Sequence, residues 1–223
     1  MTEFNDKIER WLQEVTDRCH GFAIKADLDF YAFQTKIISN PELLIVGINP
    51  GSNGKYTDYL SNNKQSKRLP HSIHYTENLL VEGGKGWEDG MQSTRRKFRE
   101  MFHDEQLFTV LQNSVMMNAI YFNTVGSSDL TILSDEIETY CVEKTKEMIE
   151  ILDPKNILIF SSDKLWLKKI GVTDIEQIDR ITKSGQWNGR AILAVPHFSA
   201  RGHNKKETRN EIGQMLKNHL NFK

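Results

Sequence analysis

The sequence predicts an α/β protein, a three-layer α/β/α sandwich in which helices cover both faces of a central four-stranded parallel sheet. The first observation is a set of short runs that are apolar almost throughout, as strands buried on both faces are. These runs cover residues 43–48, 114–122, 156–160 and 191–195. The second observation is that helical patterns alternate with the runs, an order typical of a parallel sheet between two helical layers.

Each expected helix has its own spacing or boundary signal. Apolar residues from Phe4 to Val15 recur at helical spacing, so we expect the chain to open with an amphipathic helix. Ser93 or Thr94 is a suitable cap for a helix over 93–102. The other expected helices run from near Ser134 to just before Pro154, over 163–171 and over 204–220.

The stretch 52–92 is polar and has little periodicity. Loops of this length in compact domains are usually functional or disordered. Because there is no internal repeat or low-complexity linker, residues 1–223 are expected to form a single domain.

Composition excludes several classes of protein. Hydrophobic residues make up 38% and charged residues 26%, as in soluble globular proteins. The apolar runs are strand-sized and MTEFNDKIER lacks the apolar centre of a signal peptide, so we expect no membrane segment. Cys19 and Cys141 are too few for a four-cysteine zinc or iron–sulfur site and suit a cytoplasmic location. The net charge of −1 argues against coating nucleic acid by charge alone, but a local basic face is compatible with it.

Polar motifs stand where three of the predicted strands end. Asn49 follows the first strand, Asn118 to Asn123 surround the end of the second, and His197 follows the fourth. In open α/β sheets, ligands bind outside the carboxyl ends of the strands. We therefore expect these side chains to share one edge of the sheet, where a site would form.

Each motif also has a purely structural explanation. Asn49-Pro50-Gly51 fits a type II turn, His197 could be a hydrogen-bonded structural residue, and a buried Asn118 could satisfy its amide within the protein. Basic residues form two clusters, which could be solvated helix faces or, beside His197, the path of a phosphate backbone. The clusters are Arg95, Arg96, Lys97 and Arg99, and then Arg201, Lys205, Lys206 and Arg209.

Two of the motifs together resemble a known family. GINPG after the first strand, with an H-x-S motif after the last, is the pattern of the uracil-DNA glycosylase superfamily. The combination of Asn in the GINPG motif and His in the H-x-S motif most resembles the single-strand-selective monofunctional branch. In that branch the H-x-S motif is HPSPRN, and HFSARG at 197–202 keeps His, Ser and Arg at the same spacing. Asn118 matches the family's base-reading Asn, whereas Phe198 stands in place of the usual Pro.

The resemblance implies a monofunctional DNA glycosylase that hydrolyses the N-glycosidic bond of uracil or another deaminated base in DNA, as part of base-excision repair. His197 would donate to the departing base, Asn49 would hold the attacking water, and Asn118 would read the base edge. The remaining implied contacts are Gly47, Ile48, Pro50 and Gly51 to the substrate and Ser199, Arg201 and Lys205 to DNA. The aromatic residue that stacks on the base would be Tyr56, Tyr59 or Tyr75.

The implied reaction uses water and needs no metal or cofactor, and the expected partner is DNA with a damaged or deaminated base, bound by a monomer. Three alternatives remain. The chain could bind nucleic acid or a nucleobase without cleaving it. It could be an α/β hydrolase with a Ser nucleophile, although it lacks G-x-S-x-G. It could also be a plain interaction protein, which would leave the polar strand ends without a purpose.

Overall fold

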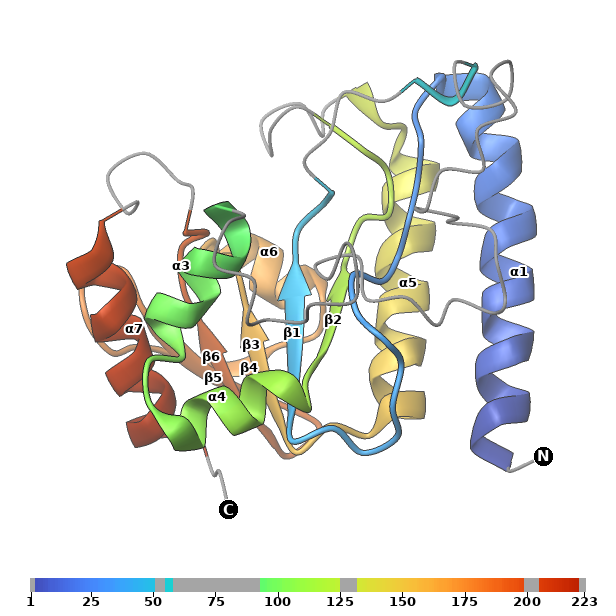
Figure 1. Ribbon diagram of the computed structural model, residues 1–223. Helices are drawn as coiled ribbons and strands as arrows, with labels where there is room; N and C mark the ends of the chain where they lie inside the picture. The colour runs from blue at the N-terminus through green and yellow to red at the C-terminus, as the bar shows by residue number, and fades with distance from the viewer. Residues whose placement is uncertain (1–2, 51–54, 58–92, 125–131, 199–204, 221–223) are drawn as a thin grey trace.

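The computed structural model describes residues 3–50, 55–57, 93–124, 132–198 and 205–220. The strands within these ranges form one six-stranded sheet (Figure 1). The strands lie in the order β2-β1-β3-β6-β5-β4. Their bounds are β1 Leu43–Gly47, β2 Val115–Asn118, β3 Asn156–Ile159, β4 Thr173–Gln177, β5 Lys183–Trp187 and β6 Arg190–Ala194. β2, β1, β3 and β6 are parallel, so the four predicted strands form the parallel part of the sheet.

The prediction of a purely four-stranded parallel sheet was wrong, because β5 and β4 extend it as antiparallel strands. Both strands are polar and mostly not buried, so they lack the apolar runs by which the other strands were recognised. Asn188 and Gly189, both with positive φ, form the two-residue turn between β5 and β6. Asn-Gly between two strands is a strong hairpin signal, so the sequence does mark this turn although the strand before it is polar.

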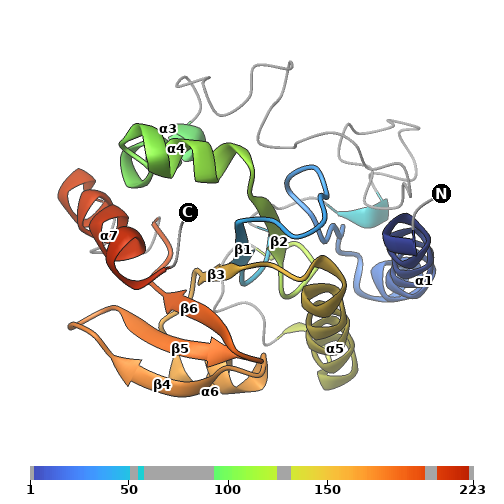
Figure 2. The ribbon, with the colours of Figure 1, turned by 90° about the horizontal axis from the view of Figure 1, so that it is seen from below.

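Helices cover both faces of the sheet (Figure 2). One layer contains α1 and α5 with the short α6, and the other contains α3, α4 and α7. Their bounds are α1 Glu3–Ala26, α3 Ser93–Met101, α4 Glu105–Gln112, α5 Asp135–Leu152, α6 Lys164–Lys169 and α7 Lys206–His219. The helix α4 was not predicted; its cap, Asp104, accepts a hydrogen bond from the Leu107 amide.

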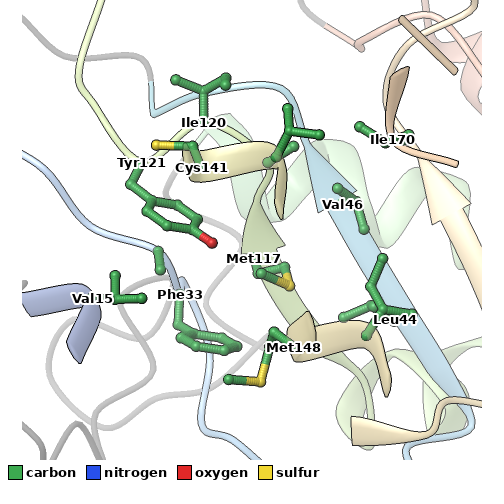
Figure 3. Close-up of a cluster of buried hydrophobic side chains, with 14 of the residues drawn as sticks. Val15, Phe33, Leu44, Val46, Met117, Ile120, Tyr121, Cys141, Met148 and Ile170 are labelled. Atoms are coloured by element: carbon green, nitrogen blue, oxygen red, sulfur yellow. The ribbon is translucent and has the colours of Figure 1, made fainter. Parts of the chain in front are cut away.

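Each face of the sheet has its own hydrophobic core. Leu44 and Val46 of β1 point to the layer of α1 and α5, whereas Leu43 and Ile45 point to the layer of α3, α4 and α7. Figure 3 shows part of the first core, with Leu44 and Val46 beside side chains from the neighbouring elements. The alternation explains why the parallel strands are apolar throughout.

The two edges of the sheet are closed in different ways. Beside β2, the backbone N–H of Gln34 donates to Met116 O at 2.8 Å, and the backbone N–H of Asn118 donates to Ala32 O at 2.7 Å. The edge strand β4 is interrupted by an irregularity between Thr173 and Glu176, and Asp174 within it has a φ of 49°. Neither edge therefore presents a long regular row of free backbone groups.

The helices α3 and α7 approach each other closely. A Cβ atom built on Gly213 of α7 would lie 2.2 Å from Met101 O at the end of α3. In the same interface the guanidinium of Arg209 pairs with the Glu100 carboxylate at 2.5 Å. These contacts fix α3 against α7, and α3 begins at the edge of the sheet where the parallel strands end (Figure 1). Among the described helices, none is both long and apolar enough to cross a membrane.

Candidate functional site

Asn49 and His197 leave the sheet at the same level. Val46 of β1, Ile159 of β3 and Ala194 of β6 are paired in register, and Asn49 and His197 each follow their strand partner by three residues. Only β3 lies between β1 and β6, and a strand spacing of about 4.8 Å puts these two strands roughly 10 Å apart. Asn49 and His197 therefore follow strands that end at the same edge of the sheet, as predicted, whereas their joining in one site stays a prediction.

The Asn49 amide has a fixed orientation. Its Nδ2 lies 3.2 Å from Pro50 O and 2.6 Å from Thr124 Oγ1. Because a backbone carbonyl can only accept, the amino group must face Pro50, and the side-chain carbonyl faces away. Within the described part of the chain, no group donates to Asn49 Oδ1. The amide is therefore held with an acceptor that the described residues do not use.

The rest of the GINPG segment is built into the sheet edge. A Cβ on Gly47 would meet Asn118 Oδ1 at 3.0 Å, so a larger residue would press on that amide. Ile48 O accepts from the Ile120 amide at 2.7 Å, and Pro50 is buried. Gly51, the last residue of the predicted turn, lies outside the described residues. The visible roles of Gly47, Ile48 and Pro50 are structural, and their predicted contacts to a substrate stay predictions.

Asn118 is fully buried and its amide is used by the protein. Its Oδ1 accepts from Gln34 Nε2 at 2.9 Å, and its Nδ2 lies 3.4 Å from Tyr31 O. These contacts correspond to the structural alternative, in which a buried amide is satisfied internally. To read a base, Asn118 would have to exchange them for contacts to the base.

His197 is half-buried in an aromatic cluster. The centroid of its ring lies 4.2 Å from that of Phe198 and 5.6 Å from that of Phe160. Burial, and secondly the positive charge of Lys97, lower the pKa of His197 to about 4. The imidazole is therefore neutral at pH 7, with one nitrogen as a donor and the other as an acceptor.

Phe198 anchors the segment that carries His197. It is 4% exposed and packs edge-on against Phe98 of α3 and Phe160, with centroids 5.2 and 5.3 Å away. From the sequence, Phe198 was interpreted only as a departure from Pro. The structure shows that its side chain ties the end of β6 to β3 and α3 through buried aromatic contacts.

The predicted DNA-binding residues and the basic clusters lie in several different environments. Ser199, Arg201 and the side chain of Arg95 lie outside the described residues. Lys205 and Lys206 are exposed at the start of α7, whereas Arg209 is buried and paired with Glu100, so it does not belong to an exposed phosphate-facing cluster. Arg99 covers the ring of Phe108 at 3.5 Å, and Lys97 faces Phe198.

Among the aromatic candidates for base stacking, Tyr56 belongs to the core. It is 1% exposed, its hydroxyl contacts His20 Nδ1, and its ring packs against Phe30. Tyr59 and Tyr75 lie outside the described residues. Thr124, Gln34, Phe160 and Lys97 are the side chains at the site that sequence reasoning did not assign to it, and Lys97 alone had a signal, its place in a basic cluster.

In the described part of the chain, no group of three or more His, Cys, Asp or Glu side chains could hold a metal ion. A scan against protein-family models and a search of curated proteins find no match to this chain. The function is therefore inferred from the geometry and chemistry of the site.

Proposed function

We propose that this protein is a DNA glycosylase that hydrolyses the N-glycosidic bond of uracil or another deaminated base. The observation that carries the proposal is the position of Asn49 and His197, which follow register-aligned strands at the carboxyl edge, one on either side of β3. Their chemistry is complementary, since Asn49 offers an acceptor and a neutral imidazole offers a donor.

His197 would act on the leaving base. Breaking the bond to deoxyribose leaves an oxocarbenium-like sugar, and negative charge builds on the departing base. A neutral imidazole can donate its N–H to the base oxygen where this charge appears, and one such preorganised donor typically contributes about 100- to 1,000-fold in rate. The aromatic contacts of Phe198 and Phe160 limit the freedom of the ring. This rigidity is what a preorganised donor requires.

Asn49 would hold the attacking water. Pro50 O and Thr124 Oγ1 accept hydrogen bonds from the Asn49 amino group, and Oδ1 would accept one from a water molecule. A neutral amide is too weak a base to remove the proton before attack, so its contribution is to position the water. Water adds to the sugar carbon and the base leaves with the bonding electrons. The proton that the water loses neutralises the departing base, so an abasic site and the free base remain.

A second function, binding nucleic acid or a nucleobase without cleavage, is favoured by the contacts of Asn118. That amide is engaged with Gln34 and Tyr31 rather than directed toward a ligand. A protein that does not select uracil for excision has no need of an amide that reads its edge. The cleavage experiment below separates the two functions.

The test is a strand-cleavage assay with end-labelled oligonucleotides that carry a single uracil, single- and double-stranded, followed by alkali to break abasic sites. Hypoxanthine and xanthine oligonucleotides form a further panel. Asn49→Ala and His197→Ala are compared with Asn218→Ala and His219→Ala, matched changes at exposed positions near the end of α7. We expect wild type and controls to cleave, and each site variant to lose about 100-fold or more.

Absence of cleavage on every base by a folded wild-type protein would refute the glycosylase. Cleavage that survives both site substitutions would place the reaction elsewhere on the molecule. Binding of the oligonucleotides without cleavage would identify the second function.

A further inference from the structure

Lys97 of α3 lies beside the segment that carries His197. Its Nζ is 5.6 Å from the centroid of the Phe198 ring, and that centroid is 4.2 Å from the His197 ring. The helix α3 begins at the carboxyl edge of the sheet (Figure 1), and Lys97 is its fifth residue. The effect of its charge on His197 indicates the same proximity.

The positive charge of Lys97 is not neutralised by the described part of the chain. The charged groups that influence it are Arg96 and Arg209, which are like charges, and Glu100. Glu100 is already paired with Arg209 at 2.5 Å, and Lys97 forms no ion pair or hydrogen bond with a described residue. An ammonium group carries three donors, so the side chain keeps its capacity to bind an anion.

The environment of Lys97 favours an arriving anion. The side chain is half-buried, and burial together with the charges of Arg209 and Arg96 lowers its pKa. An anion would offset both effects, since it stabilises the ammonium and screens it from the neighbouring guanidinium groups. Lys205 and Lys206 stand exposed at the start of α7, which packs against α3, and add positive charge to this part of the molecule.

We propose that Lys97 is a binding residue for a phosphodiester group of a nucleic-acid strand, positioned next to His197. This inference deepens the proposed function, because the phosphodiester would flank the nucleotide whose base reaches His197. A chain with a net charge of −1 has little general attraction for polyanions. A local, half-buried cation can instead fix the position of the nucleic-acid strand by holding one of its phosphates.

The test measures binding, so it does not depend on cleavage. A fluorescein-labelled single-stranded oligonucleotide without uracil is titrated over a salt series, and the slope of log K against log salt is compared between variants. Each phosphate contact to a single strand contributes about 0.7 to that slope. We expect the slope to become less steep by about 0.7 in Lys97→Gln and to stay as steep as in wild type in Lys97→Arg. Arg99→Gln removes the same charge from the same helix on the side of Phe108 and should leave the slope unchanged.

Thermal melting of each variant shows whether it is folded, and Lys97→Gln should melt at or above the wild-type temperature because it removes a like charge from beside Arg96 and Arg209. The proposal would be overturned by an unchanged slope in folded Lys97→Gln, by equal losses in Lys97→Gln and Arg99→Gln, or by a lack of binding by wild type.

Inorganic phosphate, tested at constant ionic strength, distinguishes the source of the anion. Displacement of the oligonucleotide from wild type but not from Lys97→Gln at low phosphate concentration would make free phosphate the ligand and overturn the nucleic-acid assignment. Binding that depends on Lys97 in a protein that cleaves nothing would support the phosphate site while refuting the glycosylase.

Discussion

Gly213 is the residue at which α7 crosses the end of α3, and replacing it with Ala tests how closely the two helices pack. The added Cβ would lie 2.2 Å from Met101 O and 2.9 Å from the His103 ring, whereas real Cβ contacts essentially never fall under 3.0 Å. Because Met101 O is a backbone atom, it cannot turn aside as a flexible side chain would. The helices must separate by most of an ångström, and α3 carries Lys97 and Phe98 with it.

Two effects of opposite sign determine the result. Overpacking of this kind costs about 1–3 kcal/mol, and a clash with backbone belongs near the upper value. Ala gains about 1 kcal/mol over Gly in the interior of a helix. The net loss is therefore about 2 kcal/mol, and a domain of this size loses about 2–4 °C in Tm per kcal/mol, so we expect a fall of about 4–8 °C.

The assay is thermal unfolding by circular dichroism, with Gly21→Ala as the matched control. Gly21 also lies within a helix, α1, but nothing stands within 4 Å of a Cβ built there. Gly21→Ala should therefore show the helix-propensity gain alone, a rise in Tm of about 2–4 °C. A rise in Tm for Gly213→Ala equal to that of the control would refute the close packing of α3 on α7.

Two further predictions concern the site. His197 has a pKa of about 4 in the folded protein against an ordinary 6.5. Between these pH values the unfolded chain binds more protons than the folded one. The free energy of unfolding therefore falls as the pH drops through this window, by up to about 3 kcal/mol. Urea unfolding at pH 7 and pH 4 should show a smaller loss in His197→Asn than in wild type, and equal losses would contradict the buried neutral imidazole. Thr124→Val removes the oxygen that accepts from Asn49, so cleavage should fall about 10- to 100-fold with little change in KM. Thr109→Val, which changes an exposed hydroxyl of α4, is the control, and equal rates in both variants would show that the Thr124 contact does not position Asn49.

The parallel half of the fold could be predicted because burial on both faces leaves a sequence signal. Strands such as β1, with Leu43 to Gly47 all buried, must be apolar throughout. The strand β4 lies at the edge of the sheet and β5 beside it, and both keep polar side chains, so periodicity could not find them. Asn188-Gly189 nevertheless marks the connection of β5 to β6. Ser134 accepts from the backbone amide of Ile137 in α5, and Asp163 accepts from those of Leu165 and Trp166 in α6, as expected of capping residues.

The candidate site was predictable only in outline. The order of strands and polar residues was enough to bring Asn49 and His197 to one edge, because parallel strands end on the same side. Their partners were not predictable, since Thr124 and Asn49 are joined only by the packing of distant segments. The same holds for Gln34, whose contact with Asn118 comes from the chain segment beside β2.

The closed edges of the sheet have a consequence for how this molecule meets other molecules. The segment that includes Ala32 and Gln34 already occupies the backbone groups of β2, and the irregular, acidic β4 is a poor template for a further strand. Copies of the chain therefore gain little by continuing each other's sheet, which is the usual route to edge-to-edge aggregation.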